Sequence, residues 1–353
     1  MSEVNNWFGE ELKVVMFDGS IKNIKDIKSG DVLIGPDSKP KRVLLTGVSE
    51  QDLIEFIPAR NGYSFSLGLK NKLTLASTGK NCAAKYGEIV ETSVSEFLAM
   101  RPNRQKYLTG YRSGCIHWEN VNNGEKLLLP SYYLGLWLGD GTAANTQITN
   151  MDPEVIDYIY SVSEKYNLVV RSISKGRAFM LYPSAGAPSE HCKGKNHLRN
   201  GLREMDLIKN KHIPNRYLFS SERDRLALLA GYLDTDGCLN DEYFRLTSEL
   251  DTLAEKTSFL ARSLGFAVNW RKSRPSKING KIYNNLSIIG DIQRIPTKIA
   301  RKKARNYKRK RTALKFGFKT KLLTSRHCHG IVLDGDGLFL ASDFTVLKAY
   351  DTR

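Results

Sequence analysis

The sequence predicts an α+β protein built around an internal repeat. A nine-residue motif occurs twice, as YLGLWLGDG at 133–141 and as LAGYLDTDG at 229–237. Both copies have glycine at the third position, apolar residues in the middle and Asp-Gly at the end. A short β-like segment, a helical segment and another strand follow each copy. Two copies of one α-β-β-α unit therefore fill roughly residues 126–310, which predicts a pseudo-twofold pair within one chain.

The segments that follow the motifs have helical periodicity. Apolar residues recur at the spacing of one helix face in 153–166, as at Ile156 and Ile159, and again in 249–264, as at Leu253 and Leu260. Each of these segments ends in a short run typical of a strand. The same order of elements is therefore expected in both copies.

The motifs themselves are expected to be helices that pack against each other. Serines are candidate N-caps and glycines are candidate C-terminal stops: Ser131 and Ser220 or Ser221, and Gly141 and Gly237. Small residues lie four apart in each motif, Gly135 with Gly139 and Gly231 with Thr235. Because small residues let two backbones approach closely, we expect parallel helices with their C-terminal ends side by side.

This packing would bring Asp140 near Asp236. Each carboxylate would lie at the negative end of a helix, which costs about 0.3–1 kcal/mol, and would face a like charge. Oxygen ligands with excess negative charge suit Mg²⁺, and two carboxylates holding metal between two scissile phosphates can hydrolyse phosphodiesters. The alternative is that each Asp-Gly only ends a helix.

The net charge of +17 points to a polyanionic partner, most simply nucleic acid. A basic protein without such a partner is the alternative. Residues 301–311 contain eight basic residues in eleven, a composition typical of a solvated tail or a nuclear import signal. Five scattered cysteines favour a reducing compartment, and no apolar run of membrane-spanning length occurs. We expect an intracellular protein, nuclear if the host is eukaryotic.

The two motifs resemble those of the LAGLIDADG homing endonuclease family, with LAGYLDTDG close to the sequence that names it. The resemblance implies that Asp140 and Asp236 bind the metal. It also matches NKHIP at 210–214 to a Lys-x-Ile-Pro element whose lysine, here Lys211, reaches the active site. The second repeat should supply its lysine from 300–305, and Lys303 is preferred over Lys302. Ordinary phosphate contacts are the alternative role for both lysines.

The two ends of the chain are similar to a Hint (hedgehog/intein) domain. Residues 14–37 match its opening strands around a DGS turn, and residues 329–351 match its last two strands. The resemblance implies an all-β domain formed by both chain ends, with a pseudo-twofold αββαββα endonuclease domain inserted. The expected division is 1–125, with a possible DNA-recognition insert at 80–125, then 126–310, with repeats at 126–215 and 216–310, and finally 311–353.

Protein splicing by such a domain needs three groups that this chain lacks. A Cys or Ser nucleophile should stand where Trp7 aligns, and a histidine where Asn71 or Lys72 aligns. The final His-Asn pair aligns with Leu347-Lys348. The sequence therefore predicts a derivative that does not splice. His327, Cys328 and His329 have metal-binding side chains, but consecutive strand residues alternate between faces and no Cys-x-x-Cys accompanies them, so zinc is not expected.

The family resemblance also implies that the strands of each repeat form a saddle on DNA. The candidate DNA-binding residues are Arg171, Lys175 and Arg177 in the first repeat and Arg271, Lys272, Arg274, Lys277 and Lys281 in the second. The same cations would serve equally as phosphate contacts. The resulting prediction is a monomeric, Mg²⁺-dependent endonuclease that cuts double-stranded DNA at a long specific site. The alternatives are a DNA-binding protein that has lost cleavage and a residual splicing element.

Overall fold

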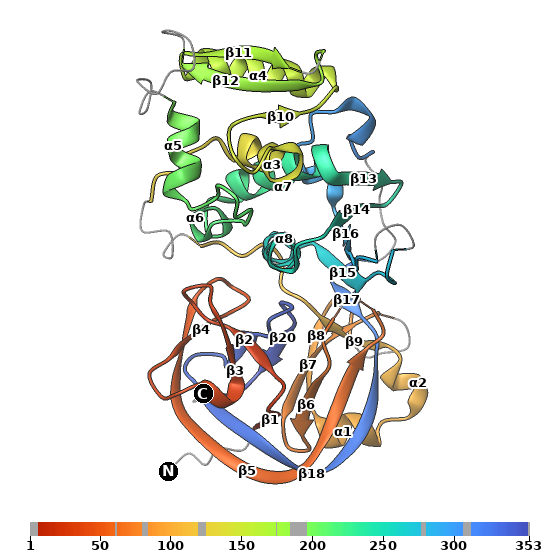
Figure 1. Ribbon diagram of the computed structural model, residues 1–353. Coiled ribbons are helices and arrows are strands. Elements are labelled where there is room, and N and C mark those ends of the chain that lie inside the picture. Colours follow the sequence, from red (N-terminus) through yellow and green to blue (C-terminus); the bar gives the residue numbers. More distant parts are fainter. Residues whose placement is uncertain are drawn as a thin grey trace. The chain divides into compact units, whose positions relative to one another are not determined.

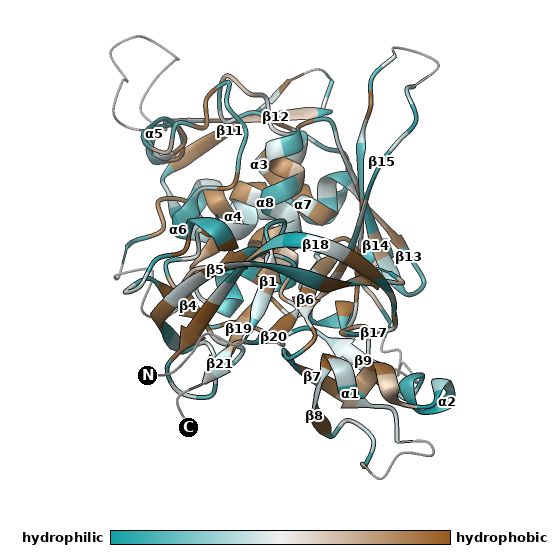
Figure 2. Ribbon diagram, turned by 90° about the horizontal axis from the view of Figure 1, so that it is seen from below, coloured by the Kyte–Doolittle hydropathy of each residue, from teal (hydrophilic) through white to brown (hydrophobic). Residues whose placement is uncertain are grey.

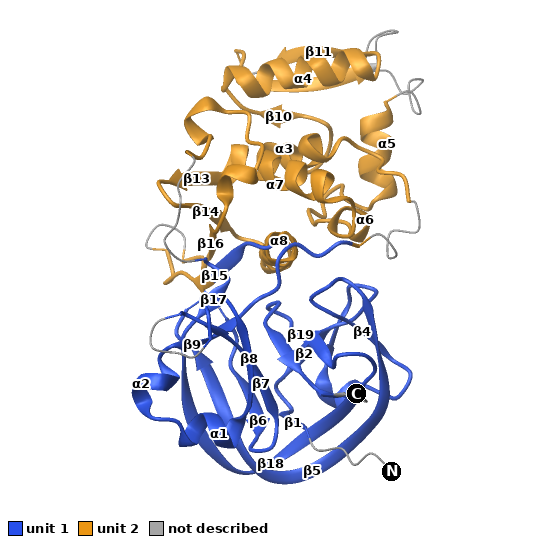
Figure 3. Cartoon of the chain, turned by 180° about the vertical axis from the view of Figure 1, so that it is seen from behind, with its two compact units in different colours: residues 1–117, 265–269, 309–353 blue, residues 118–264, 270–308 orange. Residues whose placement is uncertain are grey.

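The computed structural model describes residues 6–60, 62–79, 84–118, 125–173, 175–183, 196–276, 280–305 and 312–351 (Figure 1). The chain forms two compact units. Unit 1 comprises residues 1–117, 265–269 and 309–353, and unit 2 comprises residues 118–264 and 270–308 (Figure 3). The sequence predicted domain boundaries at 125/126 and 310/311. The grouping of 265–269 with unit 1 was not foreseen.

Unit 1 is built mainly from strands contributed by both ends of the chain. Its strands are β1 (Trp7–Gly9), β2 (Lys13–Val15), β3 (Ile21–Asn23), β4 (Val32–Ile34), β5 (Pro40–Pro58), β6 (Phe65–Gly68), β7 (Lys72–Ser77), β8 (Ile89–Ser93), β9 (Leu108–Tyr111), β17 (Lys315–Phe316), β18 (Phe318–Leu333), β19 (Leu338–Leu340), β20 (Val346–Lys348) and β21 (Tyr350–Asp351). They form a sheet in the order β21-β18-β1-β6-β5-β4, a second in the order β17-β9-β7-β8, and the pairs β19-β20 and β2-β3.

The two longest strands join distant parts of the sequence. β5 and β18 pair antiparallel from Phe318 opposite Pro58 to Leu333 opposite Val43. Much of β18 is hydrophilic (Figure 2), and its buried residues gather in the half that ends at Leu333. A core that includes Phe8, Leu33 and Phe339 lies beneath this framework, so the N-terminal and C-terminal segments share one hydrophobic core.

The expectation of a β domain built from both chain ends is confirmed, with one correction. Unit 1 also contains two short helices, α1 (Val94–Ala99) and α2 (Pro102–Gln105), within the segment predicted as a possible insert. A capping box starts α1, because the Ser93 hydroxyl accepts from the Glu96 amide while the Glu96 carboxylate accepts from the Ser93 amide. This local signal overrides the strand pattern around it.

Unit 2 contains the predicted repeat. The first copy consists of α3 (Ser131–Asp140), β10 (Ile148–Thr149), α4 (Pro153–Lys165), β11 (Leu168–Ile173), β12 (Ala178–Pro183) and α5 (His197–Glu204). After α6 (Asn215–Leu218), the second consists of α7 (Glu222–Asp236), β13 (Gly237–Asn240), β14 (Tyr243–Ser248), α8 (Asp251–Ser263), β15 (Ala267–Lys272), β16 (Asn284–Ile289) and two 3₁₀ turns, η3 (Ile292–Arg294) and η4 (Ala300–Lys302). The first three residues of β15 are among those grouped with unit 1.

The two repeats differ in their sheets. The first sheet has three strands in the order β10-β12-β11, and the second has four in the order β13-β14-β16-β15. The strand that corresponds to β13 is reduced in the first repeat to a single bridge between Gly141 and Ile148. This bridge matches the pairing of Gly237 with Leu246 in the second repeat. The αββαββα order is therefore present, with the first strand vestigial in the first repeat and 3₁₀ turns at the end of the second.

Across the described residues, none of the helices combines the length and the apolar character needed to cross a membrane.

Candidate functional site

Helices α3 and α7 lie side by side along a seam of small residues (Figure 1). A methyl group added at Gly135 would lie 2.7 Å from the Tyr232 amide nitrogen, and one at Gly231 would lie 2.9 Å from the Leu136 amide nitrogen. A methyl at Gly139 would lie 2.6 Å from the Thr235 β-carbon. Because Gly135 faces 231 and Gly139 faces 235, the helices run parallel, as the motif spacing predicts.

The observed ends of α3 and α7 agree only in part with the caps that the sequence predicts. Ser221 is the N-cap of α7, and its hydroxyl accepts from the Asp224 amide at 3.1 Å. Ser131 is not a cap: it is the first residue of α3, and its hydroxyl donates to the Asp224 carboxylate at 3.0 Å. Gly141 and Gly237 do follow the two helices, but with φ of −73° and −83° rather than the left-handed value typical of a glycine stop.

Glycine is needed at these two positions because the preceding helical turn leaves no room for a side chain. A methyl group at Gly237 would lie 2.5 Å from the Leu233 carbonyl oxygen, and one at Gly141 would lie 2.5 Å from the Trp137 ring. A side chain there would push the chain away from the helix end. The two glycines thus keep the aspartates that precede them close to the last turn.

Asp140 and Asp236 are the last residues of α3 and α7. Asp140 is half-buried, and its carboxylate accepts a hydrogen bond of 2.7 Å from the Asn150 side-chain amide. Its pKa is raised, chiefly by desolvation. Asp236 is solvent accessible, yet desolvation by the surrounding protein and then the nearby Asp140 carboxylate raise its pKa to about 6. The Asp140 carboxylate is therefore close enough to disfavour the charged form of Asp236.

Each helix end carries a lysine whose ammonium group satisfies backbone carbonyls. Lys211 donates to the Leu138 and Gly139 carbonyl oxygens, both at 3.0 Å. Lys302 donates to the Leu233, Asp234 and Thr235 carbonyl oxygens at 3.0, 2.7 and 3.2 Å. A cation there offsets the negative end of the helix dipole. Desolvation lowers the pKa of both lysines, and neighbouring aspartates oppose that shift.

In the second repeat, the lysine that lies at the end of α7 is Lys302 and not the preferred Lys303. Lys302 is buried whereas Lys303 is exposed. The 3₁₀ turn η4 ends at Lys302, and the Thr297 hydroxyl donates to the Lys302 carbonyl oxygen at 2.9 Å. This local turn directs one lysine inward and its neighbour outward, which a run of basic letters cannot reveal. The rest of the basic run, 306–311, lies outside the described residues.

Segment 298–302, which carries Lys302, is held by both repeats. The Asp234 carboxylate of α7 accepts from the Tyr132 hydroxyl at 2.5 Å and from the Lys298 amide at 2.6 Å. The Glu154 carboxylate at the start of α4 accepts from the Ala300 amide at 2.8 Å. Asp234 was not singled out from the sequence, although it is the first aspartate of LAGYLDTDG. Its role is to fix the segment that positions Lys302.

The predicted DNA-contacting residues of the first repeat are exposed. Arg171 lies on β11, and its guanidinium stacks over the Tyr182 ring of β12 at 5.0 Å. Lys175 and Arg177 lie in the turn between these strands, and Lys175 has a left-handed backbone with φ of 56°. A cation on the strand and two in the turn thus share one end of the sheet.

In the second repeat, Arg271 and Lys272 end β15, and Arg274 follows on the loop. Two of the predicted lysines form ion pairs: Lys272 with Asp251 at 2.9 Å and Lys281 with Glu249 at 2.5 Å. Lys277 lies outside the described residues. The described cations therefore lie at the end of β15 and in the segment that leads to β16, and two of them are paired with carboxylates.

The polar residues on the outer face of the second sheet were not singled out from the sequence. They are Arg245 and Thr247 on β14 and Asn285 and Ser287 on β16. The signal was present in the strand alternation, because Phe244 and Leu246 are buried while Arg245 and Thr247 are exposed. Asn150, which holds Asp140, was missed as well and follows a strand of only two residues.

Unit 1 brings together the three positions at which splicing chemistry would occur. The Trp7 amide donates to the Asn71 side-chain oxygen at 2.8 Å. Asn71 is buried, whereas Lys72 is exposed, so Asn71 occupies the position facing Trp7. The Asn6 side-chain amide donates to the Lys348 carbonyl oxygen at 3.5 Å. These positions therefore lie close together, and their side chains are an indole, an amide and an alkylammonium group.

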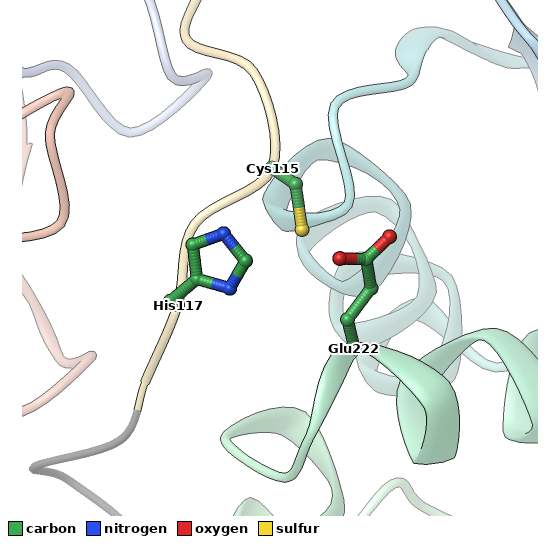
Figure 4. A group of neighbouring side chains, drawn as sticks. All are labelled: Cys115, His117 and Glu222. Atoms are coloured by element: carbon green, nitrogen blue, oxygen red, sulfur yellow. The ribbon is translucent and has the colours of Figure 1, made fainter.

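Outside the helix ends, cysteine, histidine and glutamate side chains are further candidate metal ligands. Figure 4 shows Cys115 and His117, two residues apart in unit 1, and Glu222, which begins α7 in unit 2 and pairs with Arg294 at 2.6 Å. Two ligands two residues apart are fewer than a structural zinc site uses. In the RHCHG segment, Cys328 is buried and its thiol donates to the Ser49 carbonyl oxygen at 3.3 Å, while His327 is exposed.

Comparison with known proteins locates the family signal in the second repeat. Residues 224–301 match the sequence model of the LAGLIDADG-like domain. A curated relative, the replicative DNA helicase DnaB of Mycobacterium intracellulare, is 38% identical over 232 residues, which cover 60% of this chain and 34% of that protein. The chain therefore spans about a third of the length of this relative.

Two kinds of solved structure are similar to parts of the chain. The homing endonuclease I-DmoI in complex with DNA and Mn matches at 17% identity and a TM-score of 0.32, covering 48% of this chain and 96% of that one. The gp41-1 intein matches at 13% identity and a TM-score of 0.22, covering 31% of this chain and 69% of that one.

Proposed function

We propose that this chain, whose residues 224–301 form a LAGLIDADG-like domain, is a site-specific endonuclease that hydrolyses double-stranded DNA with Mg²⁺. One observation supports the proposal above all: two carboxylates end two glycine-packed parallel helices, and a buried lysine accompanies each. Both halves of this site come from one chain, so a monomer suffices. DNA with a long specific site is the proposed substrate, because two sheets flank the helix pair.

The two aspartates fit a divalent cation. Each carboxylate lies where the helix dipole is unfavourable, and the Asp140 carboxylate also raises the pKa of Asp236. A hard cation with oxygen ligands relieves both effects. Asp140 and Asp236 would hold Mg²⁺, which when bound activates water for attack on a phosphodiester and stabilises the charge that develops.

The chain's own residues orient these groups. Asn150 donates to one oxygen of Asp140, and within the described residues the other oxygen accepts no hydrogen bond and could bind a cation. Lys211 and Lys302 are fixed by carbonyl oxygens at the helix ends, so their positive charge faces the same region as the aspartates. Positive charge fixed in advance stabilises a phosphoryl transition state more than mobile charge does.

The basic surface of unit 2 is the proposed DNA-binding surface. Arg171, Lys175, Arg177, Arg271 and Arg274 are exposed on or beside the two sheets. If they contact phosphates, the logarithm of affinity should fall by about 0.9 per contact for each unit of the logarithm of salt concentration. A salt titration of DNA binding tests this, and affinity that stays flat between low and physiological salt contradicts it.

The cleavage proposal is tested with purified protein, Mg²⁺ and a plasmid library that carries randomised sites. The expected result is linear plasmid with ends at one selected sequence. The Asp140→Asn/Asp236→Asn double variant, purified in parallel, controls for contaminating nucleases. Selective binding without cut ends would reduce the function to DNA recognition.

We further propose that unit 1 is a splicing-defective intein-like domain. Trp7 cannot accept an acyl group as a Cys or Ser can, and Asn71 cannot shuttle a proton as histidine does. Leu347-Lys348 cannot cyclise in place of His-Asn. The test places residues 7–348 between two reporter proteins and looks for product by mass. Both reporters should remain attached to the chain, and a ligated reporter product would refute the proposal.

A further inference from the structure

We propose that Arg245 selects a guanine close to the cut in the half-site bound by the second repeat. This assignment rests on the proposed endonuclease function and adds to it a specificity-determining residue that the basic clusters of the sequence did not indicate. The evidence is the position of Arg245 in the sheet, its neutral neighbours, and the absence of an ion pair to its side chain within the described residues.

Arg245 is at the middle of the outer face of the second sheet. It lies opposite Cys238 on β13 and opposite Ser287 on β16, so a strand flanks it on either side. Its neighbours along β14, Phe244 and Leu246, are fully buried and fix the strand from the other face. A cation held on a central strand has a defined direction, in contrast to one on a loop.

The position is also close to the proposed catalytic carboxylates. Strand β13 leaves the end of α7 directly after Asp236, and its second residue, Cys238, is the partner of Arg245. With strands about 4.8 Å apart and a rise of about 3.4 Å per residue, the Arg245 backbone lies roughly 8 Å from that of Asp236. A base read by Arg245 therefore belongs to the pairs nearest the scissile phosphate.

The surroundings of Arg245 distinguish it from the other cations of this repeat. Lys272 and Lys281 pair with Asp251 and Glu249 at the edge of the sheet. Within the described residues, Arg245 has neither an ion pair nor a hydrogen bond from its side chain. Next to it, the Thr247 hydroxyl donates to the Asn285 side-chain oxygen at 3.1 Å, which makes a neutral polar surface.

An arginine on a neutral polar surface is suited to bases rather than phosphates. Its planar guanidinium donates two parallel hydrogen bonds to O6 and N7 of guanine, the most frequent specific contact in the major groove. Neutral neighbours such as Thr247 and Ser287 add hydrogen-bonding groups without drawing the arginine toward a carboxylate. The peripheral cations, which lie at strand ends and loops, position the backbone instead.

The experiment measures base preference position by position. The site selected by the wild-type protein is resynthesised with each base pair replaced in turn, and binding and cleavage are measured for wild type, Arg245→Ala, Arg245→Lys and Arg274→Ala. Arg274 is the matched control, because it is an exposed arginine of the same repeat beyond the end of β15.

The wild-type protein should prefer guanine at one position near the cut by roughly 5- to 150-fold. Arg245→Ala should lose that preference and keep the others. Arg245→Lys should keep only part of it, because lysine is a donor but lacks the planar guanidinium that donates two parallel hydrogen bonds. Arg274→Ala should weaken all sequences uniformly and make the salt slope shallower by about 0.9.

The assignment is overturned if Arg245→Ala retains every wild-type base preference, or if it weakens all sites uniformly as Arg274→Ala is expected to do. A wild-type protein that selects no sequence in either assay overturns the proposed function, and this assignment with it. Loss of preference at one position alone, with other positions intact, separates the role of Arg245 from a general loss of folding.

Discussion

The two repeats of unit 2 share the ends of their central helices but differ in what surrounds those ends. Each has an aspartate as the last helical residue and a lysine bound to the preceding carbonyl oxygens. Asp140 has in addition the Asn150 amide, whereas Asp236 accepts no hydrogen bond within the described residues. The shared groups are those that the proposed metal-dependent hydrolysis of phosphodiesters would use. The differences make the two halves chemically unequal.

The outer faces of the two sheets differ even more. The first presents Val169, Arg171, Met180 and Tyr182, an apolar surface with one stacked guanidinium. The second presents the polar group described above around Arg245. A face rich in apolar groups favours contact with thymine methyls, and a face rich in donors favours direct hydrogen bonding to base edges. If the protein binds DNA as proposed, the two half-sites should therefore differ in sequence.

Removal of either aspartate tests whether the two helix ends are equivalent, and it should have the largest effect. Asp140→Asn and Asp236→Asn each remove one charged metal ligand and keep the size of the side chain. Double-strand cleavage should fall by several orders of magnitude in each variant, because hydrolysis loses its metal. DNA binding should remain or become tighter, since one negative charge has gone.

Cleavage is measured on supercoiled plasmid, which separates nicked from linear product, with binding measured in parallel. Either variant cutting both strands at a rate near that of wild type would mean that the aspartates only end their helices.

The lysines provide the next largest effect. Lys302→Met should lower cleavage by about 10²- to 10³-fold, the range expected for loss of one fixed donor in an active site. Lys211→Met should do the same for the other helix end. Lys303→Met is the matched control, because its side chain is exposed and one residue away. Single-turnover rates at saturating protein measure the effect, and equal losses in the Lys302 and Lys303 variants would contradict the assignment.

Substitutions of the seam glycines should change the stability of the fold rather than the chemistry of the site. Gly135→Ala and Gly231→Ala each place a methyl group against the backbone of the facing helix and should lower the free energy of unfolding by about 1–3 kcal/mol. This is opposite to the gain of roughly 0.5–1 kcal/mol expected for alanine in an unobstructed helix. Gly317→Ala is the control, because the added methyl group would have no atom within 4 Å apart from those of neighbouring residues in the chain.

Urea unfolding measures all three glycine variants. A stabilised Gly135→Ala protein would show that the two helices are not in contact through this residue.

A smaller effect should appear in the pH dependence of stability without metal. The pKa of Asp236 is about 6 in the folded protein and near 3.8 when unfolded, so its ionisation opposes folding. Stability conferred by the protonated form is complete below about pH 4 and is lost as pH rises through 6. Asp236→Asn should therefore be more stable than wild type at pH 8 and equal to it at pH 4.

The difference should be small because the Asp236 side chain is solvent accessible and its charge is screened. Thermal unfolding in EDTA at the two pH values measures it. A variant less stable than wild type at pH 8 would contradict the direction of the pKa shift.

Much of this architecture could be predicted from the sequence because it depends on short-range spacing. Small residues four apart predict the helix seam, and Asp-Gly at the motif ends places Asp140 and Asp236 at the same helix ends. The strand pattern of 14–37 and of 329–351 predicts that both chain ends build one unit. In each case, periodicity or a local motif carries the information.

Only the tertiary structure could decide which groups complete the site. Lys302 rather than Lys303 reaches a helix end because η4 and contacts from Asp234 and Glu154, distant in sequence, fix the turn. Asn150 contacts Asp140 because the chain folds back after β10. Within the described residues the Arg245 side chain has no ion pair, whereas Lys272 and Lys281 pair with carboxylates. Spacing along the chain determines which residues share a helix or strand face, whereas partners of single side chains are set by packing between segments far apart in sequence.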